Sequence, residues 1–341
     1  MVSAGRDTAP RGIRTRLHLS RRASAAAGKA GARKRESMVP YYAYRCAESV
    51  VRVLPQRASY WLGDRVADTL LLAAPRSLDP LRENLRHVVP DADDQSFRRI
   101  VRRNVRNLTH SWVDVMSMSS QRTDTFGRID IEHLENFTDP QERGRGVVVV
   151  SMHFGCWEVG VAGWNAQGGQ MALLAEVLRP QKLFERVIGA RGKQRVQVIP
   201  IDVAAMREGD PQTARRIGAA SMREVFRVLR SGGVIAIAID RDLIGNGELI
   251  PFFGAPAPIP VGAMDIAIRT GAAVVPIILY RNGRRVRAVC HPEIAYDAAA
   301  PRQQEVHRVT REILALFESA IHDHPDQWHV LERIWPAPEP A

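Results

Sequence analysis

Two runs of apolar residues end in side chains that are able to move protons. The run Val147–Ser151 is followed by His153 and then by Glu158, and a second run, at 234–240, ends on Asp240. A carboxylate that holds one nitrogen of an imidazole fixes the tautomer of the ring and leaves the other nitrogen free to take a proton. These residue types at these places therefore indicate a general base, with His153 as the group that accepts the proton.

The spacing of His153 and Glu158 restricts how the two side chains meet. Five residues turn a regular helix by about 500°, so the two side chains would not share one helix face. They meet only if His153 lies in the turn before the helix, where Gly155 relaxes the backbone. Free backbone N–H groups at the start of that helix would also bind a developing oxyanion. We expect this arrangement, and the alternative is a histidine whose hydrogen bonds are made within the core.

From residue 147 onward, short runs of β-branched residues alternate with stretches of helical pattern. The predicted strands span 147–151, 171–177, 197–201, 234–240, 273–280 and 286–290. The predicted helices span 158–166, 181–191, 213–230, 261–270 and 304–322. Such alternation is typical of an α/β fold, and near-continuous apolar runs fit strands that are covered on both faces. Active sites of such sheets lie beyond the carboxyl ends of the strands, where His153 and Asp240 stand.

The N-terminal part of the chain is predicted to be helical. Residues 41–74 contain two helices broken near Pro55, and residues 95–119 contain a longer helix that is basic in its first half. Tyrosine, tryptophan and arginine accompany the apolar residues of the first two helices, a pattern typical of helices at a bilayer surface as well as of an ordinary docking hairpin. We therefore expect a helical membrane-docking region over 38–120 and an α/β core in a single domain over 121–336.

Most of the net charge of +11 lies near the N-terminus. Residues 1–37 hold ten Lys and Arg against two Asp and Glu and have no apolar periodicity, so we expect a disordered basic tail. No apolar segment of a secretory signal follows its basic residues. The tail is either a contact for anionic lipid or a dispensable extension, and residues 337–341 are expected to be a flexible C-terminus. Because the charge is concentrated in the tail and no nucleic-acid-binding motif is present, a nucleic-acid-binding protein is the weaker alternative.

Several classes of site and segment are disfavoured by the residues present. The longest apolar-leaning stretch, 146–157, is shorter than the roughly 18–20 residues that span a bilayer, so no transmembrane helix is expected. His322 and His324 lack a third ligand at zinc spacing, and no metal site is expected. Glycine-rich nucleotide motifs and the serine elbow of α/β-hydrolases are absent from the sequence. Cys156 lies close to the predicted base in the sequence. It is either a thiol nucleophile or a small buried side chain, and the buried side chain is the commoner role of such a cysteine.

The pattern His153-x4-Glu158 resembles the His-x4-Asp/Glu motif of glycerolipid acyltransferases. Further segments are similar to the bacterial lipid A acyltransferase branch of that family: 229–242, 251–254, 260–262, 270–276, 324–331 and Trp335. The run that begins at Asp240 and the Trp-His ending look most like the actinobacterial phosphatidylinositol mannoside acyltransferases. The resemblance covers about residues 40–336. Three features depart from it: the acid, commonly Asp, is Glu158, the stretch 202–216 is longer, and no membrane-spanning anchor is expected.

The resemblance implies a glycerol-3-phosphate acyltransferase-like fold, with a mostly parallel or mixed central sheet flanked by helices and an N-terminal helical hairpin. It implies transfer of a fatty acyl group from acyl-CoA or acyl carrier protein to a hydroxyl of a glycolipid, most closely a phosphatidylinositol mannoside. His153 would be the general base, Glu158 would orient the imidazole, and Asp240 would be a second acid near it. Because a thiol, with a pKa of about 8.5, leaves readily, direct attack on the thioester needs no covalent enzyme intermediate, cofactor or metal.

Four further residues are expected to bind substrate. Arg241 would face phosphate or the developing oxyanion, and Arg179 would bind an anionic headgroup or a phosphate of coenzyme A unless it is only a loop arginine. Phe252 and Phe253 would line an acyl groove unless they belong to the core. Trp328 is expected to cap the core rather than to stack on a sugar.

The sequence as a whole predicts a peripheral acyltransferase at the cytoplasmic face of the inner membrane. Its expected partners are acyl-CoA, a phospholipid or glycolipid acceptor and the inner leaflet, with no nucleic acid and no metal. The alternatives are an acyltransferase for another lipid or a secondary-metabolite alcohol, and a protein that binds acyl lipid without turnover. The presence of both His153 and Glu158 disfavours the last of these.

Overall fold

The computed structural model describes residues 36–118, 129–166, 169–193 and 196–335. The chain divides into two units, Met1–Ser37 and Met38–Ala341, and the second unit holds all the described helices and strands. The predicted disordered tail lies outside the described residues except for its last two positions. The predicted flexible C-terminus lies wholly outside them.

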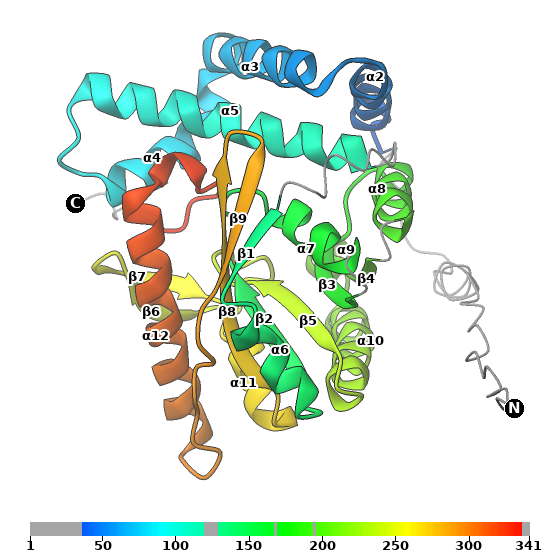
Figure 1. The fold of residues 1–341 in the computed structure, drawn as a ribbon, viewed down its shortest axis with the longest axis vertical. Helices are drawn as coiled ribbons and strands as arrows, with labels where there is room; N and C mark the ends of the chain where they lie inside the picture. The colour runs from blue at the N-terminus through cyan, green and yellow to red at the C-terminus, as the bar shows by residue number, and fades with distance from the viewer. Residues whose placement is uncertain (1–35, 119–128, 167–168, 194–195, 336–341) are drawn as a thin grey trace, which may run out of the picture. The chain divides into compact units, whose positions relative to one another are not determined.

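The centre of the second unit is a mixed seven-stranded sheet within the described residues, with the strand order β1-β9-β8-β2-β5-β3-β4 (Figure 1). The strands are β1 (Ile129–Glu132), β2 (Val147–Ser151), β3 (Met171–Glu176), β4 (Gln197–Ile201), β5 (Val234–Ala238), β8 (Ala273–Asn282) and β9 (Arg285–Cys290). Every pairing is parallel except that of β8 with β9. The predicted α/β class and the mostly parallel or mixed sheet are confirmed.

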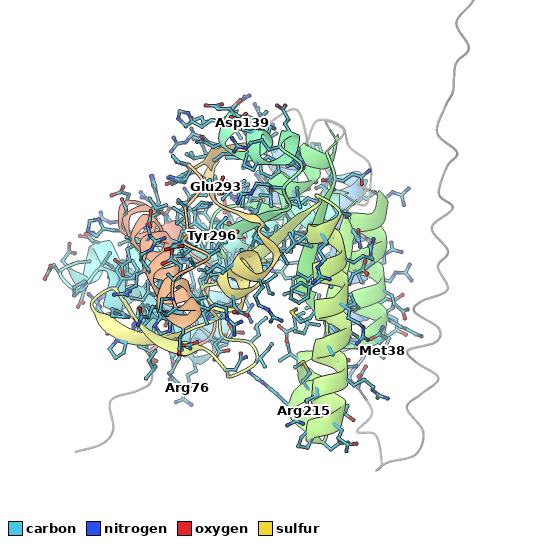
Figure 2. All side chains as sticks on the ribbon, turned by 90° about the horizontal axis from the view of Figure 1, so that it is seen from below. Met38, Arg76, Asp139, Arg215, Glu293 and Tyr296 are labelled. Carbon is cyan, nitrogen blue, oxygen red and sulfur yellow. The ribbon has the colours of Figure 1, made fainter. Side chains whose placement is uncertain are left out.

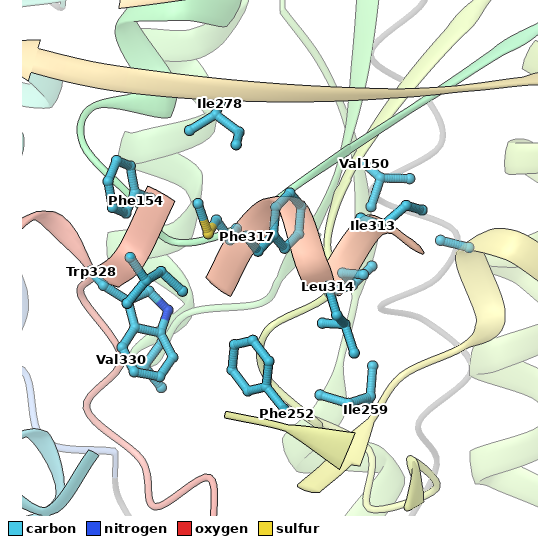
Figure 3. Close-up of a cluster of buried hydrophobic side chains, with 14 of the residues drawn as sticks. Val150, Phe154, Phe252, Ile259, Ile278, Ile313, Leu314, Phe317, Trp328 and Val330 are labelled. Atoms are coloured by element: carbon cyan, nitrogen blue, oxygen red, sulfur yellow. The ribbon is translucent and has the colours of Figure 1, made fainter. Parts of the chain in front are cut away.

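Two groups of helices cover the two faces of this sheet. The first group is α6 (Glu135–Glu142) and α7 (Trp157–Ala166), and the second is α10 (Pro211–Arg230), α11 (Gly262–Thr270) and α12 (Arg302–Asp323). All five residues of β2 are buried, and they alternate between the two cores. Val149 packs in the cluster of α6 and α7, whereas Val150 packs in the cluster of α12 with Phe317 (Figure 3). A strand covered on both faces explains the continuous apolar run in the sequence.

The N-terminal helices lie at the end of the sheet where β2 finishes (Figure 1). They are α2 (Val39–Val53), α3 (Gln56–Ala73), the 3-10 turn η1 (Pro75–Leu78), α4 (Asp79–Val88) and α5 (Asp94–Met118). The predicted break near Pro55 is present because the residue before a proline avoids helical backbone, and Leu54 is extended with ψ 146°. The long helix α5 packs against α3 and also reaches α7 and the C-terminal segment.

The remaining elements are shorter or lie at the edges. They are α8 (Gln181–Lys193), α9 (Val203–Glu208), the hairpin of β6 (Glu248–Phe252) with β7 (Ala255–Ile259), and the 3-10 turn η3 (Pro325–Gln327). Arg215 marks the first turns of α10, the helix that follows α9 (Figure 2). None of the helices in the described part of the chain is long and apolar enough to cross a membrane.

Candidate active site

His153 lies in the turn that joins β2 to α7, as the sequence spacing predicts. The strand ends at Ser151 and the helix begins at Trp157. Gly155 in this turn has a φ of +60°, and a Cβ atom there would lie 1.7 Å from the backbone oxygen of Leu279 in β8. Glycine is therefore required at this position, because any side chain would push the turn away from the sheet.

The partner of the His153 ring is Asp240, which stands just after β5. The Nδ1 atom of His153 lies 2.7 Å from Oδ1 of Asp240, and the backbone N–H of His153 donates to Oδ2 at 2.8 Å. The indole N–H of Trp328 donates to the same Oδ2 atom at 3.0 Å. Since β2 and β5 are neighbouring parallel strands, their carboxyl ends place the two side chains together.

The charge state of Asp240 follows from these contacts. Burial by itself would raise the pKa of this fully buried carboxyl group, but the charge of His153 and the hydrogen bonds from His153 and Trp328 outweigh burial and hold the pKa below its usual value. An ionised Asp240 fixes the proton of the imidazole on Nδ1. The Nε2 atom of His153 has no hydrogen-bond partner among the described residues, and the ring lines a cavity.

The expectation that Glu158 orients the imidazole is corrected by this geometry. Glu158 lies in the first turn of α7, and its Oε1 atom accepts a hydrogen bond from Nη2 of Arg191 in α8 at 2.6 Å. The helical rotation between the turn and Glu158 carries the carboxylate away from the ring. Glu158 and Arg191 both line the same cavity as His153, so the acid contributes to the cavity wall rather than to the His153 hydrogen bond.

The cavity has a volume of about 560 Å³ and runs between α7 and the sheet. Its wall is largely apolar, with residues such as Val115, Val149, Val161, Leu173 and Leu279. Polar side chains are grouped beside His153 and at the loop after β5. A largely apolar cavity with His153 in its wall is suited to a substrate with a hydrocarbon chain and one reactive polar group.

The two predicted substrate arginines occupy different places. Arg241 lines the cavity and forms ion pairs with Glu332 and, at 3.9 Å, with Glu176. Arg179 follows β3, does not line the described cavity, and donates to both carboxylate oxygens of Asp202 at 2.8 Å. The structure thus brings Arg241 to the site of His153 and leaves Arg179 on a neighbouring loop.

Phe252 and Phe253, which were expected to line an acyl groove, do not line the cavity that contains His153. Both lie in an aromatic cluster with Trp328 and Trp335, and Phe252 stacks on Trp335 with ring centroids 5.7 Å apart. Phe252 belongs to the core on the α12 face of the sheet, whereas the cavity lies on the α7 face. The motif is part of the β6–β7 hairpin, which packs against α12. Phe252 is buried in the core and Phe253 is partly buried against it, which favours the alternative of a core pair.

Cys156 does not have the environment of a nucleophile. The thiol is buried, and its Sγ atom lies 3.5 Å from Oδ2 of Asp114. Burial raises the pKa of the Cys156 thiol to about 12, so the reactive thiolate is not formed near neutral pH. No group of three or more metal-binding side chains is present in the residues that the structure describes.

Sequence reasoning missed the contact of Trp328 with Asp240 and that of His329 with the turn that carries His153. Trp328 is fully buried, as expected for a residue that caps the core, and it also donates to Asp240. The backbone N–H of His329 donates to the backbone oxygen of His153 at 2.7 Å. Burial lowers the pKa of His329 to about 3, so this second histidine is neutral beside His153. A buried indole needs a hydrogen-bond acceptor, and that was the signal available in the sequence.

Comparison with known proteins agrees with the motif resemblance. The model of the bacterial lipid A biosynthesis acyltransferase family matches residues 31–336. A phosphatidylinositol mannoside acyltransferase of Mycolicibacterium smegmatis is 26% identical over 268 residues, which cover 75% of this chain and 79% of that protein. A phosphatidylinositol mannoside acyltransferase of Mycobacterium tuberculosis strain H37Rv is 27% identical over 312 residues, which cover 86% of this chain and 88% of that protein.

Proposed function

Since the chain belongs to the bacterial lipid A biosynthesis acyltransferase family, we propose that it transfers a fatty acyl group from acyl-CoA or acyl carrier protein to a hydroxyl group of a glycolipid. The observation that carries the proposal is the His153–Asp240 pair at the edge of an apolar cavity. The two mycobacterial relatives are named for phosphatidylinositol mannoside, and we propose an acceptor of that type. Another lipid or a secondary-metabolite alcohol is the alternative acceptor.

His153 is the general base of the proposed reaction. Its Nε2 atom takes the proton of the acceptor hydroxyl while the hydroxyl oxygen attacks the thioester carbonyl carbon. Asp240 holds the Nδ1 proton and stabilises the imidazolium that forms. The new carbon–oxygen bond forms, the carbon–sulfur bond breaks, and the imidazolium returns its proton to the departing thiolate. The reaction balances without a further reactant.

The acyl chain of the donor occupies the cavity in this proposal. A cavity of about 560 Å³ falls within the range of roughly 300–1,000 Å³ that is typical of small-molecule sites. Each buried methylene contributes about 0.8 kcal/mol, so a fatty chain gains most of its binding free energy from the apolar wall. We propose that Arg241, which lines the cavity, faces a phosphate or the developing oxyanion.

A membrane surface supplies the acceptor lipid in this proposal, with the protein bound peripherally to the cytoplasmic face of the inner membrane. The N-terminal helices expose large apolar side chains, among them Val53 at 80%, Trp61 at 62% and Leu72 at 84%. Arginines of the same two helices, Arg52 and Arg65, are also exposed. Apolar and basic side chains on one pair of helices support binding to an anionic lipid surface.

A donor assay tests the proposal. Purified protein is incubated with palmitoyl-CoA and detergent-solubilised mannosylated phosphatidylinositol, and free thiol and lipid mass are followed. We expect thiol release with a matching gain of acyl mass, and a rate lower by a factor of about 10²–10⁴ in His153→Ala. His322→Ala is the matched control, because His322 is an exposed histidine in the last turn of α12 and should leave the rate unchanged.

The outcomes of the assay show separately whether the chain cleaves the thioester and whether the mannoside lipid accepts the acyl group. Thiol release without acylated lipid rejects the mannoside acceptor and retains the thioester chemistry. No release with either palmitoyl-CoA or palmitoyl acyl carrier protein rejects the proposed transfer. An unchanged rate in His153→Ala rejects His153 as the base.

A further inference from the structure

A short C-terminal segment, Gln327–His329, crosses the turn that carries His153. Phe154 and Trp328 form an isolated antiparallel bridge. The backbone N–H of Gly155 donates to the oxygen of Gln327 at 2.8 Å, and the backbone N–H of His329 donates to the oxygen of His153 at 2.7 Å. The backbone of the turn is therefore held from His153 to Gly155 by residues more than a hundred positions later in the chain.

The side chain of Trp328 extends this contact to Asp240. Its indole N–H donates to Oδ2, which also accepts the backbone N–H of His153, and this leaves Oδ1 to face the imidazole. The indole is fully buried beside Phe154, Phe252 and Val330 (Figure 3). Packing on all sides prevents the ring from moving, and water is not available to replace its N–H group as a donor.

A carboxylate that is held at one oxygen alone is free to rotate about its Cβ–Cγ bond. With Oδ2 fixed by two donors, Oδ1 has one position, and that position is 2.7 Å from Nδ1 of His153. We infer that Trp328 is a positioning residue that sets the orientation of Asp240, and through it the tautomer and direction of the His153 ring. This inference rests on the proposed function of His153 as the base.

The segment is itself anchored by hydrogen bonds from α5. Asn104 is fully buried there, and its Nδ2 atom donates to the backbone oxygens of Pro325 at 3.0 Å and Trp328 at 2.7 Å. A buried amide with its hydrogen bonds made is a rigid support. The orientation of Asp240 thus depends on a chain of contacts that runs from α5 through the Trp328 backbone to the indole N–H.

The test removes the indole N–H and retains the aromatic ring. We expect Trp328→Phe to lower kcat by at least about tenfold with KM for the acyl donor unchanged, since a displacement of about 1 Å in a reacting group can cost a factor of about 100. Trp335→Phe is the matched control. Trp335 lies in the same aromatic cluster, but its indole N–H donates to the backbone oxygen of Phe252 at 3.2 Å and not to Asp240.

A second variant distinguishes the loss of the indole N–H group from a loss of folding. Trp328→benzothienylalanine replaces the ring N–H by sulfur and keeps the shape of the indole, so the packing of the core is retained. It should reproduce the loss of kcat while the thermal unfolding midpoint stays near that of the wild type. Wild-type kcat in this variant would overturn the inference, and so would an equal loss of kcat in Trp335→Phe.

A measurement without substrate separates this inference from the proposed function. In protein labelled with ¹⁵N-histidine, the ring signals of His153 are identified by their loss in His153→Ala. We expect a single tautomer with the proton on Nδ1 in the wild type and in Trp335→Phe, and shifts averaged between two tautomers in both Trp328 variants. A single Nδ1–H tautomer in the Trp328 variants would overturn the positioning role even if the chain proved inactive with every donor.

Discussion

At the scale of single residues, the site is a pair of side chains that the sequence places after two different strands. The sequence identified both His153 and Asp240, because each stands where a buried strand ends. It assigned the hydrogen bond to the wrong acid, since Glu158 is near His153 in sequence and Asp240 is near it in space. Strand order decides which segments meet, and that order is set by packing of the whole sheet rather than by any local pattern.

Asp240→Asn tests the assignment of the acid. The amide offers no charge to stabilise the imidazolium and presents donors where an acceptor is needed, so we expect kcat to fall by a factor of about 10³–10⁴, as for the loss of charge in other histidine–aspartate pairs. The rate of thiol release with saturating acyl donor is the measurement. Glu158→Gln is the control for the histidine environment, because Glu158 hydrogen-bonds Arg191.

The two variants are distinguished by the His153 ring signals. Glu158→Gln should leave the tautomer of His153 unchanged, whereas Asp240→Asn should alter it, because the amide can no longer hold the Nδ1 proton as a carboxylate does. If Glu158→Gln shifted the tautomer and Asp240→Asn did not, the assignment of Asp240 as the partner would be contradicted.

At the scale of elements, periodicity predicted the strands that are buried and the helices that cover them. The runs at 147–151 and 197–201 coincide with β2 and β4. The continuous apolar run of β2 is typical of a strand covered on both faces, whereas β4 lies at the edge of the sheet and is only partly buried. The four-residue β1 and the hairpin of β6 and β7 were not predicted. Their residues are only partly buried or include prolines, so hydrophobic pattern alone does not mark them.

A buried ion pair joins two elements that sequence analysis treated separately. Arg281 of β8 donates to Asp114 of α5 at 2.7 Å, and their side chains are 3% and 1% exposed. Tyr60 of α3 also donates to Asp114 at 2.7 Å. The N-terminal helices are thereby tied to the sheet through charges that only the folded chain brings together.

Arg281→Met is expected to lower the free energy of unfolding by about 3–5 kcal/mol, because it leaves Asp114 buried and uncompensated. Urea titration measures the change. The double variant with Asp114→Leu should regain most of the loss, since it removes both charges. Arg285→Met is the control on the neighbouring strand, where the pair with Asp130 is exposed and its loss should leave stability nearly unchanged. A loss in the double variant as large as in Arg281→Met would contradict this account of the pair.

At the scale of the whole molecule, charge and apolar surface are distributed in a way that composition alone does not show. Most of the net positive charge lies in residues 1–37, whereas the large exposed apolar side chains include several on α2 and α3. Electrostatic attraction to an anionic membrane acts over about one Debye length and weakens with salt. Insertion of apolar side chains is not screened, so the two contributions can be measured separately.

Trp61→Ser combined with Leu72→Ser tests the apolar contribution. Each large apolar side chain contributes about 1.5–3 kcal/mol when it is fully removed from water, so partition onto vesicles should fall by more than about tenfold. The measurement is co-sedimentation of the full chain with vesicles of phosphatidylcholine and phosphatidylglycerol in equal parts. Leu249→Ser is the matched control, because Leu249 is exposed to a similar degree but lies on β6.

Salt dependence and kcat are measured on the same double variant of α3. As salt is raised, vesicle binding by the double variant should weaken by the same factor as vesicle binding by the wild type, because the arginines and the basic tail are unchanged. Its kcat on detergent-solubilised lipid should also be unchanged, since both side chains are exposed and neither lines the cavity. Binding equal to the wild type would show that α3 does not enter the lipid surface. Equal losses of vesicle binding in the double variant and in Leu249→Ser would show that exposed apolar side chains promote binding wherever they lie on the surface. That result would contradict the proposed orientation of the N-terminal helices toward the membrane.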